Sequence, residues 1–272
     1  MTSPKNKISA CLVIRNEEGS IERALKSIKN FVDEIIVVHD GPCSDTSLAI
    51  CKKYTQNVFV RPFIGEAEPH RVFTFEKAKN NWILQLDADE FLSKTLQKNV
   101  RKLTEDKTIS CYEFIWPYWD GKRYQTTNWP FKKALFQKAR ITFTAFPHAE
   151  VSVDGVTKRT NLRLEHRPNY DNLSFSVFKN KHLEWAKIHA RYLLKDPSTY
   201  VRYPKNKKVS LPRYYFIVKR PLLYALPLAF YQGFQVLKSQ GLKVSFLGLK
   251  NSLLLFFYYF FLAIEVKRLK KI

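Results

Sequence analysis

Apolar and polar residues alternate in blocks along the first 90 residues of the chain. Short apolar runs predict four strands, at Ile8–Ile14, Glu34–Val38, Asn57–Val60 and Trp82–Leu86. Between these runs, apolar residues recur at three- and four-residue spacing, which predicts helices that begin after Ser20, after Ser44 or Asp45, and at Glu68. Strands that alternate with helices form a parallel sheet that is covered on both faces. We therefore expect an α/β fold.

The middle of the chain has a different pattern. Residues 108–165 are rich in aromatic side chains and predict an irregular, antiparallel region with strands at Phe143–Val153 and Asn161–Leu164. Residues 171–195 return to helical spacing, and after Pro204 the chain consists of apolar stretches separated by single Lys or Arg residues. We expect the antiparallel region to extend the parallel sheet into a mixed one.

Polar residues follow all four predicted strands. They are Arg15, Asn16 and Glu17 after the first strand, His39 and Asp40 after the second, Arg61 after the third, and Asp87, Asp89 and Glu90 after the fourth. In sheets of this kind, ligands bind at the carboxyl ends of the strands. The sequence thus predicts a site at this edge, and its acidic character indicates a cation or hydroxyl groups as partners.

Two of these acids have a spacing that favours a metal. Asp87 and Asp89 are separated by one residue, so an extended backbone points both carboxylates to the same side. Such carboxylates repel each other unless a cation lies between them. A hard divalent ion, Mg²⁺ or Mn²⁺, prefers oxygen ligands and can also bind a diphosphate.

The charge of the chain is large and uneven. It contains 46 Lys and Arg against 24 Asp and Glu, a net charge of +22, while its 45% hydrophobic content excludes intrinsic disorder. Residues 201–272 hold fourteen basic residues and one acidic residue. We expect an α/β catalytic domain over residues 1–200 and a separate basic, apolar region over 201–272 whose partner is either nucleic acid or an anionic membrane surface.

The apolar runs of the tail distinguish between those two partners. The longest, Pro221–Leu237 and Asn251–Ile264, are both shorter than the ~20 apolar residues that a membrane span needs. Because cations flank Leu- and Phe-rich runs, we expect amphipathic helices that lie in the interface of an anionic leaflet, and no nucleic-acid partner. A buried helix pair and a last segment that enters the membrane more deeply stay open as alternatives.

The cysteines and the N-terminus bear on the compartment. The four cysteines have no metal-type or disulfide-type spacing, and Met1–Lys7 is polar and basic. These features predict buried free thiols in a reduced setting, with the protein peripheral on the cytoplasmic face of a membrane.

Three segments together resemble a known family. Val13-Ile14-Arg15-Asn16-Glu17-Glu18, then Glu34–Gly41, then Trp82–Glu90 are similar to glycosyltransferase family 2, in the branch with lipopolysaccharide-core glucosyltransferases. The resemblance implies a GT-A fold, with a Rossmann-like nucleotide-binding half, a mixed sheet and an acceptor half. It also implies a nucleotide-sugar donor, with uridine as the expected base, a divalent metal and inversion at the anomeric carbon. Where the family has V-D-D-G-S, this chain has His39-Asp40-Gly41-Pro42, so one acid is missing.

The resemblance also implies roles for the residues that bind the donor. Asp40 would face the nucleobase, and Asn16 and Glu17, with Arg15 before them, would line the nucleoside pocket. Arg71 would meet a phosphate, although a solvated helix cation is an equal alternative.

The metal and the base are assigned in the same way. Asp87 would contact ribose or metal, and Asp89 would bind the metal directly. Pro147-His148-Ala149-Glu150-Val151, followed by Gly155 and Leu164-Glu165-His166, resembles the branch's H-E…G…L…H pattern. Glu150 aligns with the catalytic acid, but Ala149 separates it from His148, which stays a rival base. His166 would be a further metal or diphosphate contact.

These expectations describe an inverting transferase that moves a sugar to a lipid-linked, lipopolysaccharide or glycan acceptor. A sugar nucleotidyltransferase would need a Gly-rich, Lys- or Arg-bearing loop after the first strand, where this chain has Arg15-Asn16-Glu17-Glu18-Gly19. A non-enzymatic basic binding protein, of membranes or nucleic acid, is the remaining alternative.

Overall fold

A computed structural model describes residues 6–124, 130–171, 173–208, 211–239 and 246–270. The chain forms two compact units that are interleaved in sequence. The first comprises residues 1–118, 129–168 and 201–208, and the second comprises 119–128, 169–200 and 209–272.

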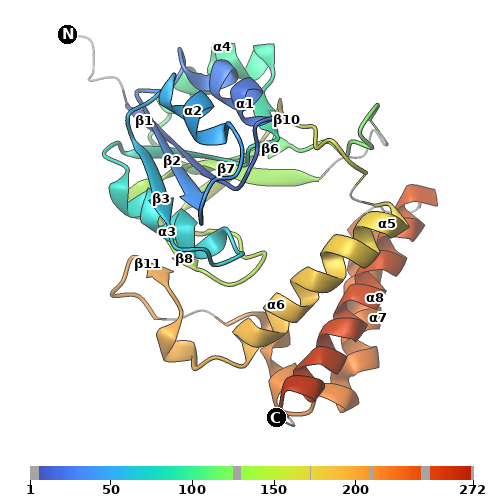
Figure 1. Ribbon diagram of the computed structural model, residues 1–272. Helices are drawn as coiled ribbons and strands as arrows, with labels where there is room; N and C mark the ends of the chain where they lie inside the picture. The colour runs from blue at the N-terminus through green and yellow to red at the C-terminus, as the bar shows by residue number, and fades with distance from the viewer. Residues whose placement is uncertain (1–5, 125–129, 172, 209–210, 240–245, 271–272) are drawn as a thin grey trace. The chain divides into compact units, whose positions relative to one another are not determined.

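The first unit contains an eight-stranded sheet in the order β3-β2-β1-β4-β7-β6-β10-β5. Its strands are β1 (Ile8–Ile14), β2 (Glu34–Asp40), β3 (Val58–Arg61), β4 (Trp82–Leu86), β5 (Glu90–Leu92), β6 (Ile109–Ile115), β7 (Phe131–Gln137) and β10 (Val156–His166). Strands β1 to β4 pair in parallel, whereas β7 pairs antiparallel with both β4 and β6 (Figure 1). The sheet is therefore mixed, as the sequence predicts.

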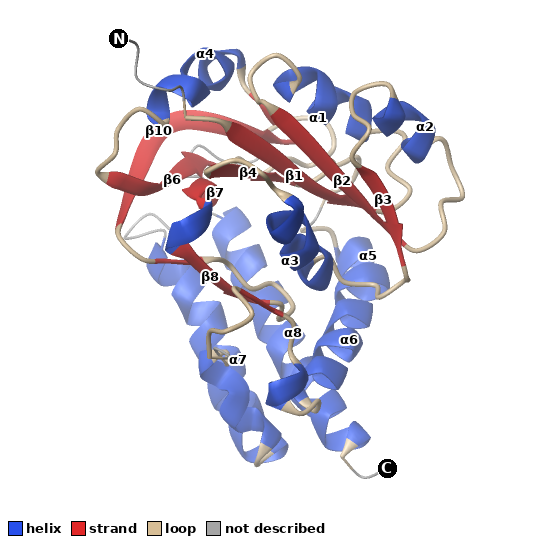
Figure 2. Ribbon diagram, turned by 90° about the vertical axis from the view of Figure 1, so that its left-hand side faces the viewer, coloured by secondary structure: helices blue, strands red, loops and turns tan. Residues whose placement is uncertain are grey.

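Helices cover both faces of this sheet, as Figure 2 shows. They are α1 (Ile21–Ile28), α2 (Ser47–Lys52), α3 (Glu68–Lys77) and α4 (Lys94–Leu103). Side chains alternate along β1, so Leu12 packs in one core with Leu25 of α1, while Cys11 packs in the other with Phe75 of α3. The predicted α/β architecture is confirmed.

Some local predictions were wrong. His39 and Asp40 belong to β2, and the turn begins at Gly41, whose φ of 81° suits glycine. Helix α1 begins directly after Ser20, as predicted, but the Ser20 side chain forms no capping hydrogen bond, and its hydroxyl donates to the Glu17 carboxylate. Helix α2 begins at Ser47, later than the predicted start after Ser44 or Asp45.

The segment predicted as one strand, Phe143–Val153, is broken. It forms β8 (Ile141–Thr144) and β9 (Ser152–Val153), separated by a loop in which His148 has a φ of 61°. This left-handed backbone cannot continue a strand. A third short strand, β11 (Arg202–Tyr203), pairs with β8, so residues just past 200 pack with the first unit.

The second unit consists of helices. They are α5 (Phe175–Val177), α6 (Leu183–Leu193), α7 (Pro221–Ser239) and α8 (Phe246–Leu269), with a π-helical turn at Phe178–His182 and 3₁₀ turns at Pro197–Thr199 and Arg213–Val218. Buried His189 of α6 bonds the Tyr258 hydroxyl at 3.0 Å and the Tyr214 hydroxyl at 2.8 Å. The helical segment predicted at 171–195 thus belongs to the same unit as residues 209–272. The predicted division at residue 200, between a catalytic domain and a membrane-association region, is a functional one and stays a prediction.

Among the described residues, one helical stretch, Gly248–Leu269, is long and apolar enough to cross a membrane, and a third of its most apolar part is buried within the protein. The apolar run predicted at 251–264 is the centre of this longer helix. Cys11, Cys51 and Cys111 are buried, and all four cysteines are free thiols.

Candidate functional site

The predicted site residues lie where three neighbouring strands end. Strand β1 pairs in parallel with β2 and with β4, and Ile14 lies opposite His39. The segments that follow Ile14, Asp40 and Leu86 therefore leave the sheet at the same edge. At this edge the structure brings together acidic and basic side chains from separate parts of the sequence.

The loop after β1 is held by its own polar groups. Asn16 has a φ of 51°, and its N–H donates to Nε2 of His39 at 3.2 Å, while its Oδ1 accepts the Ser44 N–H at 3.0 Å. The Glu17 carboxylate accepts the Ser20 hydroxyl at 2.7 Å. The Arg15 guanidinium lies 3.8 Å above the Phe63 ring. Their roles in nucleoside binding stay predictions.

Asp40 is buried and fully engaged. Its carboxylate accepts the N–H groups of Ile64 and Gly65 at 2.7 and 2.9 Å, and it lies 2.8 Å from Nε2 of His70. Asp40 thus fixes the loop after β3. A contact with a nucleobase stays a prediction, and it would require this carboxylate to share its partners.

Asp87 lies between two cations. Its Oδ1 accepts from Nη2 of Arg71 at 2.7 Å, and its Oδ2 from Nζ of Lys132 at 2.8 Å. Burial alone would raise the pKa of Asp87, but the Lys132 and Arg71 charges outweigh it and hold that pKa well below its usual range.

Glu90 completes this cluster from within the core. It is fully buried, accepts the indole N–H of Trp116 at 2.6 Å and the Asp87 N–H at 2.9 Å, and pairs with Lys132 at 2.5 Å. Burial raises the pKa of Glu90. Sequence reasoning missed Lys132, because it predicted no strand at Phe131–Gln137, where the structure has β7.

Asp89 and His166 meet beside this cluster. Asp89 Oδ2 lies 3.4 Å from His166 Nε2, and the imidazole stacks on Trp116 with ring centroids 4.0 Å apart. A carboxylate is an oxygen ligand that suits Mg²⁺ or Mn²⁺, and a neutral imidazole can also bind a divalent metal. Within the described part of the chain, no group of three His, Cys, Asp or Glu side chains could hold a metal, so a metal here would need further ligands from a substrate or water.

Asp87 is less suited to the role of a direct metal ligand than Asp89 and His166. Both of its oxygens already accept from cations at hydrogen-bond distance. The metal site as a whole stays a prediction, in which Asp89 and His166 are the best-placed ligands.

Both candidate bases lie on the loop between β8 and β9. The Glu150 side chain is 65% exposed, and its carboxylate lies 3.3 Å from Nζ of Lys133. The His148 N–H donates to Oε1 of Glu68 at 3.0 Å. The surrounding protein lowers the pKa of His148 by desolvation, although the residue still reaches solvent, so the imidazole is neutral near pH 7.

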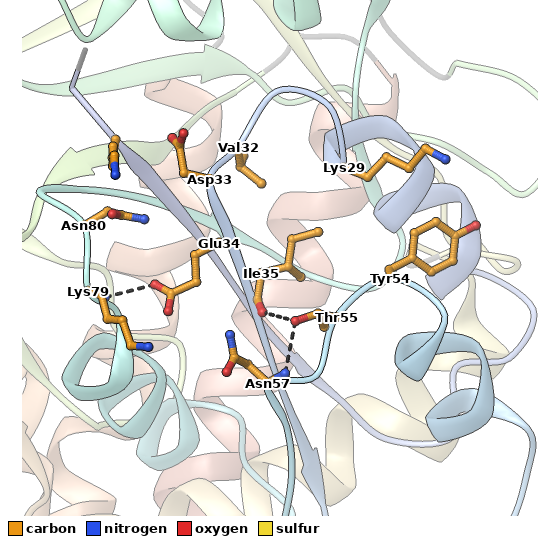
Figure 3. Close-up of a pocket in the computed structure, with 11 residues that line it drawn as sticks. Lys29, Val32, Asp33, Glu34, Ile35, Tyr54, Thr55, Asn57, Lys79 and Asn80 are labelled. Atoms are coloured by element: carbon orange, nitrogen blue, oxygen red, sulfur yellow. Dashed lines mark hydrogen bonds between the residues drawn. The ribbon is translucent and has the colours of Figure 1, made fainter. Parts of the chain in front are cut away.

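Figure 3 shows a separate depression of about 410 Å³ near Lys29, Asp33, Glu34 and Lys79. Glu34 begins β2, so this depression lies at the amino ends of the strands, opposite to the edge where ligands bind in such sheets. Its polar groups are engaged, since the Glu34 carboxylate accepts the Lys79 N–H at 2.9 Å and the Ser9 hydroxyl at 2.6 Å. We therefore place the site at the other edge.

Comparison with known proteins gives three findings. The family model described as "Glycosyl transferase family 2" matches residues 9–155. An uncharacterized glycosyltransferase of Rickettsia felis is 43% identical over 94 residues, which are 35% of this chain and 32% of that protein. The match thus spans about a third of that relative. The lipopolysaccharide core biosynthesis glycosyltransferase LpsC of Rhizobium meliloti is 26% identical over 132 residues, covering 46% of this chain and 48% of LpsC.

Solved structures also align with the chain. S. aureus TarS 1–349, crystallised with UDP-GlcNAc, is 14% identical with a TM-score of 0.48, covering 97% of this chain and 92% of that one. Glucosyl-3-phosphoglycerate synthase of Mycobacterium tuberculosis, crystallised with Mn²⁺, UDP-glucose and phosphoglyceric acid, is 23% identical with a TM-score of 0.34, covering 41% of this chain and 44% of that one.

Proposed function

The chain belongs to glycosyl transferase family 2, and from this premise we propose that it transfers a sugar, with inversion, from a UDP-sugar to a hydroxyl of a lipid-linked or lipopolysaccharide acceptor. It is a glycosyltransferase with a GT-A-type α/β fold, which removes the alternatives of a nucleotidyltransferase and a non-enzymatic binding protein. The observation that carries the proposal is the convergence of Asp89, His166, Asp87, Arg71 and Lys132 at the carboxyl ends of the strands.

The donor diphosphate would bind at this convergence. Asp89 and His166 would hold a divalent metal, Mg²⁺ or Mn²⁺, which when bound supplies positive charge to the leaving diphosphate. Arg71 and Lys132 add two cations within 3 Å of Asp87. Both side chains are largely buried, so the charges that meet the phosphates are held in place before the donor arrives.

The acceptor side needs a base. In an inverting transfer, the acceptor oxygen forms a bond to the anomeric carbon as the bond to the diphosphate breaks, and the acceptor proton passes to the base. We propose Glu150 for this role, because its exposed carboxylate can reach an acceptor hydroxyl. His148, neutral near pH 7 and on the same loop, is the alternative base.

The second unit supports attachment to an anionic membrane on its cytoplasmic face. Exposed apolar side chains recur at three- and four-residue spacing along both long helices, which places them in one stripe on each helix. They are Leu222, Leu226, Phe230 and Phe234 on α7 and Phe246, Leu249, Leu253 and Phe257 on α8. Exposed cations at the helix ends, among them Lys219, Arg220 and Arg268, would meet lipid phosphates.

A lipid-linked acceptor is supported by an apolar groove of about 450 Å³ in the same unit. Phenylalanine and leucine side chains of α5, α6, α8 and the π-helical turn line it, including Phe178 and Phe261. Lys250 lies at the groove and pairs with Asp171 at 3.7 Å. The volume lies within the roughly 300–1,000 Å³ of small-molecule sites.

The test is a panel of nucleotide-sugars with Mn²⁺ or Mg²⁺, scored by thermal stabilisation and by release of the nucleoside diphosphate. We expect a UDP-sugar with metal to stabilise the protein and to be turned over, and EDTA to abolish both effects. The absence of stabilisation by every nucleoside diphosphate with metal would refute the proposal.

A further inference from the structure

The loop between β8 and β9, which carries both candidate bases, is held in an unusual backbone conformation. His148 has a φ of 61°, a left-handed conformation that residues other than glycine seldom adopt, so surrounding structure has to hold it. The His148 N–H donates to Oε1 of Glu68 at 3.0 Å. Glu68 is the first residue of α3, and its side chain is only 7% exposed. One buried carboxylate therefore ties this loop to α3.

Glu68 also contacts the donor side of the site. Its Oε1 lies 3.7 Å from Nη1 of Arg71, while Nη2 of the same guanidinium donates to Asp87 at 2.7 Å. Arg71 thus contacts both Asp87, which lies at the donor site, and Glu68, which holds the loop of the candidate bases. The two halves of the site are linked through one cation.

A neighbouring acid, Glu66, can satisfy the second carboxylate oxygen of Glu68. Oε2 of Glu68 is buried and has no hydrogen-bond partner that the described atoms provide. A buried acceptor without a donor is costly. Burial and, after it, the charge of Glu68 together raise the pKa of Glu66 to about 9, so Glu66 is protonated at pH 7 and can supply the missing proton.

We propose that Glu68 is a positioning residue that places the loop of His148 and Glu150 and makes its position depend on the donor. The inference rests on the proposed function, because it takes the base to lie on this loop. A donor diphosphate beside Arg71 competes for the guanidinium that Asp87 and Glu68 share. The strength of the Glu68 tether thus changes when the donor binds.

The test compares Glu68→Ala and Glu68→Gln with Glu76→Ala in the full chain. Glu76 lies on the same helix but pairs with Lys205 at the surface, so its loss controls for a general effect on α3. Three quantities are measured: UDP affinity with Mn²⁺ by calorimetry, kcat of transfer, and amide hydrogen exchange of residues 145–151 with and without UDP and Mn²⁺.

We expect Glu68→Ala to keep its UDP affinity, to lose protection of the His148 amide, and to lower kcat on the order of 100-fold, the size of effect that a misplaced reacting group produces. Glu68→Gln keeps an oxygen for the His148 N–H and should recover part of the loss. In the wild type, UDP with Mn²⁺ should change exchange in this loop, and in Glu68→Ala it should not.

Two outcomes would overturn the inference. One is that the exchange of residues 145–151 in Glu68→Ala matches the wild type. The other is that UDP affinity and kcat fall by the same factor, which indicates a purely structural role. A failure of the proposed function is distinguished from both, because it shows as a wild type that neither binds UDP nor transfers sugar, whereas the exchange of the ligand-free loop still reports on the tether.

Discussion

Replacing Lys132 with methionine removes the cation between two acids. The Lys132 side chain is 18% exposed, and its ammonium lies 2.5 Å from Glu90 and 2.8 Å from Asp87. Methionine keeps most of the apolar stem of the side chain. It leaves Glu90, which is fully buried, without its charge partner. Removal of one member of a buried ion pair costs about 3–5 kcal/mol. Because Asp87 is a third exposed and keeps Arg71, we count only the Glu90 pair in full and expect a loss of about 3 kcal/mol at pH 8.

The neighbouring residue provides a matched control. Lys133 lies on the same strand and pairs with Glu150, whose side chain is 65% exposed, so Lys133→Met should cost about 0–1 kcal/mol. The free energy of unfolding of both variants and of the wild type would be measured by urea denaturation.

The loss in Lys132→Met should also depend on pH. Burial already raises the pKa of Glu90, and this pKa rises further without the lysine. At a pH between the ordinary Glu pKa and this raised pKa, Glu90 binds a proton in the folded variant but not in the unfolded chain. The stability of the variant therefore falls as the pH rises above about 4.3, and the deficit should be smaller at pH 5.5 than at pH 8. Equal effects of the two lysine substitutions, or a deficit that does not change with pH, would refute this account of the cluster.

Three further predictions concern activity and attachment. Asp89→Ala should lose the stabilisation by UDP with Mn²⁺, which in the wild type is about 2.7 kcal/mol at a ligand concentration of ~100 Kd; a normal shift in Tm would rule out Asp89 as the metal ligand. Glu150→Gln should lower kcat by roughly 10²–10⁴-fold with little change in UDP affinity, whereas near-normal turnover would transfer the role of base to His148. Phe230→Glu, in the exposed stripe of α7, should weaken binding to phosphatidylglycerol vesicles by roughly 10- to 100-fold, since burial of such a side chain contributes about 1.5–3 kcal/mol. Unchanged cosedimentation of Phe230→Glu would show that this stripe does not contact lipid.

The sequence alone determined the parallel part of the fold and the edge where the site lies. The strands at Ile8–Ile14 and Trp82–Leu86 match their predicted ends, because a buried strand needs a largely apolar run and a group of polar or charged residues ends it. Asp87 and Asp89 could be placed at the ligand-binding edge for the same reason. These features depend on residues that are close in sequence, where burial and backbone geometry are encoded by the local pattern.

Only the tertiary structure decided which charges act together. Lys132 reaches Asp87 because β7 pairs antiparallel with β4, and Glu68 reaches His148 because a left-handed loop turns its N–H toward α3. Likewise, α6 packs against α8, and Arg202 and Tyr203 pair with β8. Such contacts depend on strand register, on loop geometry and on which apolar surfaces bury each other, and no local pattern of polar and apolar residues carries that information.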